Sequence, residues 1–221
     1  FVQAAHEPAP VRHHRWLGSF TAEEKAAIYR PEVADALRNT DALDVARSYY
    51  DRCGAGDVLN RVLYMDMKLY LDTDILAKVD RTSMASSLEA RVPFLNAEML
   101  DLANRIPLGL KLKGFTRKHL LRKVMRGVLP DNIIDRPKKG FNIPVAKWFR
   151  RELKGLLLDT LSRDNVARAG LFDYRGVEHL LNEHFSGRRD NRKLLWTLLV
   201  LQLWYDTWAT PHSAATAALE L

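Results

Sequence analysis

The stretch KVDRTSMASSLEARVPFL, residues 78–95, indicates a helical fold. Its first part favours a helix, because Met84 and Leu88 fall on one face at helical spacing. The pair Val92-Pro93 forces extended backbone, since the proline ring clashes with a helical residue before it. We therefore predict a helix from Lys78 to Ala90 that ends before this proline.

Helical signals dominate the rest of the sequence. Thr21 and Glu24 form a capping box for a helix that should stop near Pro31. Asp57 can cap the next helix, in which apolar residues recur at helical spacing as far as Leu69. Further helices are predicted over 98–105, 116–125, 147–162, 173–185 and 190–208, with an ordered loop over 130–144. Without strand-like alternation, repeats or a domain boundary, the chain is predicted to be a single all-α body, with helix 190–208 the most buried.

Composition limits the classes of function. The 221 residues are 47% hydrophobic and 28% charged, which is typical of a globular protein, and the formal net charge of +7 favours anionic partners. The single cysteine, Cys53, cannot form an internal disulfide, which predicts a reducing, cytoplasmic location. The longest apolar stretch, 194–208, is shorter than the roughly 20 residues of a membrane span, so no membrane partner is expected. Phe1 is not an initiator methionine, so we expect a fragment or a processed product.

Several common catalytic motifs are absent from the sequence. It contains neither a G-x-x-x-x-G-K-[ST] phosphate loop nor a G-x-G-x-x-G dinucleotide fingerprint, and Gly54-Ala-Gly56 is typical of a plain turn. His179 and His184 stand five residues apart, off a common helical face, and one cysteine cannot support a zinc cluster. A metal centre built from this chain alone is therefore not expected.

A first charged cluster brackets the predicted helix 78–90. Lys78 and Asp80 lie at its start, and Glu89 and Arg91 at its end. These charges could be no more than exposed ion pairs, each worth about 0–1 kcal/mol. Their density beside the small residues 85–87 instead favours a site that a ligand can approach closely.

A second cluster lies on the predicted helix 116–125. Leu120, Leu121, Val124 and Met125 form its apolar stripe, which we expect to be buried. Lys118 then lies at the edge of that stripe, where its methylenes can pack while the ammonium reaches a phosphate. Arg122 points further outward. A lysine that only packs its stem and exposes its charge explains this pattern equally well.

Two more basic stretches leave other interpretations open. Residues 136–144 could hold an anion or form a solvated turn. Residues 188–193 add a basic run that would suit a non-catalytic, helical nucleic-acid-binding module. Against that alternative, the aromatic residues Trp196, Trp204, Tyr205 and Trp208 belong to the helix expected to be buried and are not interleaved as stacking platforms.

Together these clusters resemble a known family. The run from Asp74 to Leu95 is similar to the signature of glutamine-hydrolysing asparagine synthetases. Lys111-Leu-Lys113, Lys118, Leu120-Leu-Arg122, Leu129-Pro130, the run from Arg136 to Phe141, His184-Phe-Ser-Gly187 and the closing tryptophans follow in the family's order. The resemblance covers 69–208 well and the first 60 residues more weakly. It implies the helical C-terminal portion, over 1–221, of an α/β adenine-nucleotide-binding synthetase domain with a pyrophosphate loop.

The resemblance implies an ATP-dependent carbon–nitrogen ligase. In this family aspartate attacks the α-phosphate of ATP, and ammonia from a glutaminase domain that hydrolyses glutamine then displaces AMP to give asparagine. Lys118 matches the lysine that touches the phosphates. Asp80 and Glu89 match catalytic positions, and Lys78, Arg91 and Arg122 match phosphate partners, with Mg²⁺ bridging the phosphates and no metal ligand assigned to this chain.

The sequence also departs from the family pattern. The Ser-Gly-Gly-x-Asp-Ser pyrophosphate loop and the N-terminal cysteine of the glutaminase are absent from it. We therefore expect the upstream synthetase sheet and the glutaminase domain to be partners, and this chain alone to be inactive. A homodimer is compatible with the resemblance. Related enzymes that adenylate another substrate, such as an amidotransferase, a β-lactam synthetase or a peptide cyclase, stay open as alternatives.

Overall fold

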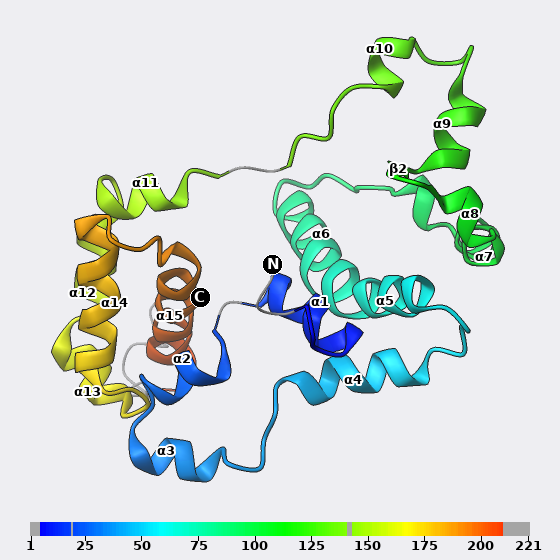
Figure 1. Cartoon of the computed structure of the whole chain (residues 1–221). Coiled ribbons are helices and arrows are strands. Elements are labelled where there is room, and N and C mark those ends of the chain that lie inside the picture. The colour runs from blue at the N-terminus through cyan, green and yellow to red at the C-terminus, as the bar shows by residue number, and fades with distance from the viewer. Residues whose placement is uncertain (1–4, 19, 141–142, 210–221) are drawn as a thin grey trace. The chain divides into compact units, whose positions relative to one another are not determined.

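In the computed structural model, which describes residues 5–18, 20–140 and 143–209, the chain is mostly helical, as predicted (Figure 1). It divides into two compact units, unit 1 with residues 1–14 and 42–140 and unit 2 with 15–41 and 141–221. The prediction of a single body is wrong. The chain passes between the units at residues 14–15, which are helical, and through non-helical, mostly exposed residues near 38–41 and 136–140.

Unit 1 contains most of the predicted charged clusters. It comprises the start of α1 (Ala9–Leu17), α4 (Leu43–Arg52), α5 (Val58–Asp66), the π-helix η2 (Met67–Leu76), α6 (Ala77–Met84), the 3-10 turn η3 (Pro93–Leu95), α7 (Ala97–Arg105), α8 (Leu108–Lys111), β1 (Leu112–Lys113), β2 (Thr116–Arg117), α9 (His119–Met125) and α10 (Asp131–Ile134). The Asp57 side chain caps α5 by accepting from the Asn60 N–H at 2.8 Å, as predicted. The helices predicted from Asp57 and from Lys78 are one run, because Met67 and Ala77 at the junctions keep helical dihedral angles.

The buried cluster of unit 1 is small. Ala46, Tyr50 and Met65 form it between α4 and α5. Arg61 closes one side, with its guanidinium 4.0 Å from the centre of the Tyr50 ring and its Nε donating to the Tyr50 carbonyl at 3.0 Å. His13 on α1 contacts Asp66 at 2.6 Å. This packing joins α1, α4 and α5 but buries little of the rest of unit 1.

Unit 2 is a bundle of short helices. It comprises α2 (Ala22–Ala26), α3 (Pro31–Ala36), α11 (Val145–Arg150), α12 (Lys154–Thr160), α13 (Arg163–Ala169), α14 (Tyr174–Ser186), α15 (Arg192–Trp204) and the π-helical turn η4 (Tyr205–Ala209). The predicted capping box of Thr21 and Glu24 is confirmed. The helix predicted over 147–162 is instead two helices, because Arg151 leaves the helical region with φ −132° and ψ −93°.

A continuous apolar core holds unit 2 together. Its buried residues among those described are Ile28, Phe149, Leu157, Leu161, Val166, Phe172, Val177, Leu180, Leu181, Leu194, Leu195, Leu198 and Leu199. The segment after α2 docks on α14 at Gly176, where an added Cβ would lie 2.9 Å from the Ala27 carbonyl oxygen. The Tyr29 and Phe172 rings stack beside this contact, with centroids 5.8 Å apart.

Helix α15 is buried on one face only. Leu195, Leu198 and neighbouring leucines enter the core, which confirms part of the expected burial. The prediction that its tryptophans are buried is wrong: Trp196, Trp204 and Trp208 are 45%, 55% and 75% exposed. The apolar residues run all round this helix, whereas the core of unit 2 covers one side of it, so the others face outward.

His184 and Asn191 form a polar centre within the apolar core. The His184 side chain is fully buried. Its Nδ1 accepts from the Asn191 N–H at 3.2 Å, so its Nε2 carries the proton that is donated to the Ala146 carbonyl at 3.3 Å. Burial, with the charge of Arg150 nearby, lowers the pKa of His184. A neutral histidine therefore links α11, α14 and the start of α15.

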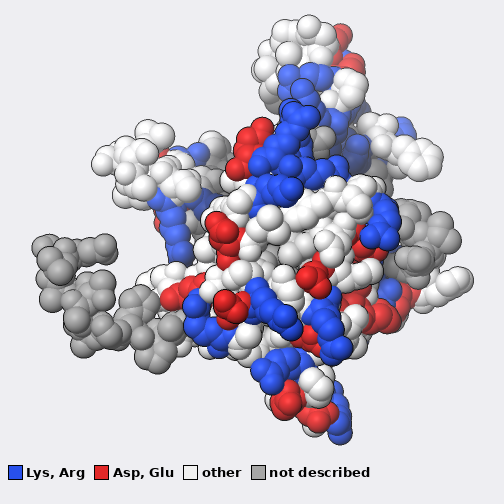
Figure 2. Space-filling view, turned by 90° about the vertical axis from the view of Figure 1, so that its left-hand side faces the viewer, with Lys and Arg blue, Asp and Glu red and all other residues white. Residues whose placement is uncertain are grey.

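Charges of both signs cover the surface. Lys and Arg side chains are spread over the face that Figure 2 shows, with Asp and Glu side chains among them. Many are exposed ion pairs one helical turn apart, such as Arg47–Asp44 at 2.8 Å and Arg105–Asp101 at 2.9 Å. Within the described part of the chain, no helix is long and apolar enough to cross a membrane.

Candidate active site

All six residues predicted to form the site lie in unit 1. Lys78 and Asp80 are on α6, as predicted. The Lys78 ammonium pairs with Asp74 at 2.7 Å, one turn earlier on the same exposed surface. Asp80 is exposed, and its carboxylate has no ion-pair partner among the described residues. Residues two apart project about 200° from each other around a helix, so Lys78 and Asp80 leave α6 on opposite sides.

Helix α6 ends earlier than predicted. Ser87 adopts a left-handed conformation with φ 55°. Its N–H donates to the Met84 carbonyl, and the Leu88 N–H donates to the Ser83 carbonyl, both at 2.9 Å. These two bonds are the pattern of a Schellman motif, which stops a helix by pairing its last carbonyls. The predicted extension of the helix to Ala90 is therefore wrong.

Glu89 and Arg91 consequently stand on extended chain beyond α6. Their side chains form an ion pair at 3.0 Å and are both largely exposed. Such a pair contributes little to stability, about 0–1 kcal/mol. A ligand could therefore bind either charged group at little cost to the stability of the fold.

Lys118 sits at a junction that the sequence did not predict. Leu112 pairs with Arg117 and Lys113 with Thr116 in a hairpin, whose two-residue loop begins at Gly114. Gly114 has φ 57°, and glycine at the first loop position suits a type II′ turn. Because the hairpin takes up Thr116, α9 starts at His119 and not at Thr116. Lys118 is its N-cap residue, left-handed with φ 55° and ψ 38°.

The environment of Lys118 also differs from the prediction. None of the apolar stripe on α9 is buried, and Leu121 and Val124 are 40% and 62% exposed. The described part of unit 1 places no core against this stripe, so Lys118 does not lie at the edge of a buried surface. Its side chain is exposed and has no ion pair within the described ranges. The Lys118 ammonium therefore stands exposed at the open end of the hairpin, where α9 begins.

Arg122 belongs to a charged network between α9 and α10 that the sequence analysis missed. Its guanidinium lies 3.5 Å from the Asp135 carboxylate. Arg126 donates to both Asp135 oxygens at 2.6 Å and to Asp131 at 2.5 Å. These hydrogen bonds raise the pKa of Arg126, Asp135 contributing most. The spacing of Asp131 and Asp135, after two arginines four residues apart, was the available signal.

The predicted groups are assembled only in part. Among residues 5–18, 20–140 and 143–209, no hydrogen bond or ion pair joins Lys118 to Lys78, Asp80 or Glu89. Arg136 to Gly140 are exposed, as a solvated basic loop would be, whereas Phe141 and Asn142 lie outside the described residues. Exposed lysine and arginine side chains fit the phosphates of a nucleotide. The described residues contain no group of three or more His, Cys, Asp or Glu that could hold a metal ion.

Comparison with known proteins adds independent evidence. The family model described as asparagine synthase matches residues 4–206. Asparagine synthetase (glutamine-hydrolysing) 1 of Bacillus subtilis is 34% identical over 168 residues, 76% of this chain and 26% of that protein. Asparagine synthetase (glutamine-hydrolysing) 3 of the same organism is 35% identical over 133 residues, 60% of this chain and 22% of that protein.

A fungal relative is named as an amidase. Amidase chyE of Penicillium rubens is 26% identical over 151 residues, 65% of this chain and 22% of that protein. The chain spans about a quarter of the length of the curated relatives it matches. No solved structure matches it.

Proposed function

The chain belongs to the asparagine synthase family, and from this premise we propose that it works as the helical part of a glutamine-dependent asparagine synthetase. In the proposed reaction, aspartate attacks the α-phosphate of ATP through its side-chain carboxylate and releases pyrophosphate. Ammonia from glutamine then displaces AMP to give asparagine. The family match over residues 4–206 is the observation that carries this proposal.

Lys118 is the residue we propose for the adenylation step. Its exposed ammonium at the start of α9 is free to contact phosphate oxygens and to offset the negative charge that grows on the α-phosphate. Asp80 would order the site, and Glu89 would orient or deprotonate the attacking ammonia. Lys78, Arg91 and Arg122 would contact the nucleotide phosphates, each after exchanging its present carboxylate partner.

Magnesium would enter this site with the nucleotide. As the family resemblance implies, phosphate oxygens would be its main ligands, with no ligand assigned to this chain. When bound, the ion would neutralise phosphate charge beside Lys118.

The proposal includes partners for the exposed apolar surface of unit 1. Leu88, Phe94, Leu102, Val124 and Val128 are each more than half exposed. Exposed apolar area on this scale is typical of an interaction surface. We propose that the nucleotide-binding sheet of a synthetase covers it, with a glutaminase domain supplying ammonia, in a cytoplasmic enzyme for which a homodimer is one compatible assembly.

The first test uses a complete synthetase that contains this chain. Lys118→Ala should lower ATP–pyrophosphate exchange by about a hundredfold or more, as loss of one stabilising donor does in other enzymes. Lys123→Ala is the matched control, because Lys123 is exposed on the same helix and has no proposed role. Exchange at the wild-type rate in the Lys118→Ala enzyme would remove this lysine from the mechanism.

The second test concerns the 221 residues by themselves. We expect them to show neither asparagine formation nor pyrophosphate exchange, because the sequence has no pyrophosphate loop. Robust exchange by this chain alone would contradict the proposed division of the site.

A different acceptor is the second candidate function. The similarity to a protein named as an amidase favours considering it. Exchange measured with aspartate, with other carboxylates and with no acceptor would distinguish an asparagine synthetase from a related amidotransferase, β-lactam synthetase or peptide cyclase. A nucleic-acid-binding module would instead bind DNA or RNA with an affinity that falls steeply as salt rises.

A further inference from the structure

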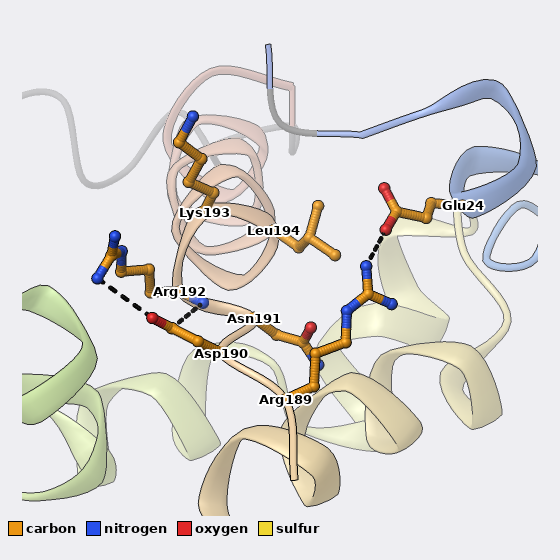
Figure 3. A pocket seen from close by; sticks show the side chains of 7 residues that line it. All are labelled: Glu24, Arg189, Asp190, Asn191, Arg192, Lys193 and Leu194. Carbon is orange, nitrogen blue, oxygen red and sulfur yellow. Dashed lines mark hydrogen bonds and ion pairs between the residues drawn. The ribbon is translucent and has the colours of Figure 1, made fainter. Parts of the chain in front are cut away.

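A pocket of about 200 Å³ opens at the N-terminal end of α15 in unit 2. It is lined by Glu24 and by residues 189–194, as Figure 3 shows. Most pockets for drug-sized ligands have volumes of about 300–1,000 Å³, so this smaller space suits a small metabolite and not a nucleotide.

One side of the pocket attracts negative charge. Helix α15 has 13 residues and presents its positive end here. The Arg192 N–H already donates to the Asp190 carboxylate at 3.2 Å, and the N–H groups of Lys193 and Leu194 are the ones left to point out of the helix. Arg189, Arg192 and Lys193 stand around that end, and the Lys193 ammonium donates to the Trp16 carbonyl at 3.0 Å. A carboxylate placed there would meet the two remaining N–H groups and the positive side chains, and Lys193 has further N–H donors to offer it.

The other side presents a buried acceptor. Asn191 is 1% exposed, and its amide nitrogen donates to the Leu180 carbonyl and to Glu183, both at 3.0 Å. These bonds fix which end of the amide is oxygen. That oxygen, Oδ1, has no hydrogen-bond partner among the described residues, and in Figure 3 it is directed towards the pocket. Burying an unpaired acceptor costs about 1–3 kcal/mol, so a ligand with a donor would be favoured here.

Two carboxylates in the pocket lining also favour a ligand that donates hydrogen bonds. Glu24 pairs with Arg189, and Asp190 pairs with Arg192 at 3.1 Å, yet both carboxylates line the pocket. Beside Asn191 Oδ1 they disfavour an anion with many charges, such as pyrophosphate. The helix end and three basic residues equally disfavour a simple cation.

We propose that this pocket binds a small zwitterion of the α-amino acid class. The ligand carboxylate would lie at the first turn of α15 near Lys193, and its ammonium would donate to Asn191 Oδ1 and face Glu24. The inference rests on unit 2 alone and does not depend on the proposed synthetase activity.

The test is a titration of the ¹⁵N-labelled 221-residue chain followed by NMR. L-Alanine is the probe, and propionate and ethylamine are its matched controls, because each lacks one of its two charges. We expect alanine to shift the amide signals of Lys193 and Leu194 saturably, with a Kd at least tenfold lower than that of either control. Equal binding of propionate would make this an anion site, and no saturable shift with any probe would leave only water there. Either result overturns the proposal.

A pair of neighbouring variants locates the ammonium. Glu24→Gln removes the charge that lines the pocket, while glutamine is still accepted in the capping box with Thr21. Glu23→Gln is the control, since Glu23 is on the same short helix and does not line the pocket. Alanine binding should weaken at least fivefold in Glu24→Gln and stay unchanged in Glu23→Gln.

A second pair of variants tests the pocket independently, in case Glu24→Gln fails to fold. Lys193→Met should weaken alanine binding at the carboxylate end, whereas Lys147→Met, an exposed lysine of the same unit, should not. Unchanged binding in both Glu24→Gln and Lys193→Met would exclude this pocket as the alanine site.

Discussion

Unit 2 and unit 1 bury apolar side chains to very different extents. Among the described residues, the core cluster of unit 2 contains thirteen buried side chains, whereas the cluster of unit 1 contains three. Unit 1 nevertheless carries Lys118, Asp80 and the other predicted site residues, and it has the more exposed apolar surface. Apolar burial is the main source of folding free energy. We therefore expect unit 2 to be the stable scaffold, and unit 1 to need a covering surface before its charged groups are fixed.

The largest expected effect comes from shortening a side chain in the core of unit 2. Leu195→Ala, at a fully buried position of α15, should lower the free energy of unfolding by about 2–5 kcal/mol. Leu203→Ala is the matched control on the same helix. Because Leu203 is 43% exposed, this substitution should lower the free energy of unfolding far less. Urea denaturation followed by circular dichroism would measure both. Equal losses would show that α15 is buried on its outer face too.

Hydrogen exchange compares the two units directly. Backbone amides of α14 and α15 should exchange about a hundredfold or more slowly than those of α7 and α9, because they open only with the core. Mass spectrometry of peptides from the labelled chain would resolve these helices. Similar protection in α9 would mean that unit 1 is as stable as unit 2, and would contradict the expectation that unit 2 is the stable scaffold.

A glycine pair tests how closely the segment after α2 packs on the scaffold. Gly176→Ala would push a methyl group against the Ala27 carbonyl and Ile28, so it should destabilise unit 2 by about 1–3 kcal/mol. Gly155→Ala lies on α12 with nothing within 4 Å and should stabilise it by about 0.5–1 kcal/mol. Opposite shifts in melting temperature are expected. Shifts of the same sign would contradict the close contact at Gly176.

The smallest expected effect is a change in the stability of unit 2 with pH. Burial lowers the pKa of folded His184 below its ordinary value of about 6.5. The unfolded chain thus binds more protons as pH falls below about 6.5, and stability is lost from there down to the lowered pKa. Melting temperatures between pH 5 and 8 would show this loss. It should disappear in His184→Gln and persist in His179→Gln, whose imidazole is exposed.

Local signals in the sequence predicted much of the fold. The caps predicted at Thr21 and Asp57 start helices where expected, since each depends on a side chain that accepts from a backbone N–H three residues away. The helix predicted over 173–185 also begins where expected, with Asp173 as its cap. Helix α7 likewise lies within one residue of its predicted start. Such bonds involve neighbours in sequence and need no knowledge of the tertiary structure.

The failures have tertiary or backbone causes. The left-handed Ser87 ends α6 early, and the hairpin at Gly114 displaces the start of α9, although Gly114 was a usable signal. Burial was misjudged for Trp196 and Val124, because an apolar residue does not reveal whether a partner surface covers it. The roles of Lys118, Asp80 and Glu89 stay predictions, since their chemistry depends on groups that no hydrogen bond or ion pair here brings to them.

The left-handed backbone of Lys118 has a consequence for evolution and engineering. For a residue with a Cβ this conformation costs roughly 1–2 kcal/mol, a penalty that glycine avoids. A search for more stable variants would therefore select Lys118→Gly, and in doing so would delete the charge proposed for adenylation. At this position stability would compete with the proposed role of Lys118 in adenylation. Lysine there is best understood as a compromise that selection for thermal tolerance alone would not retain.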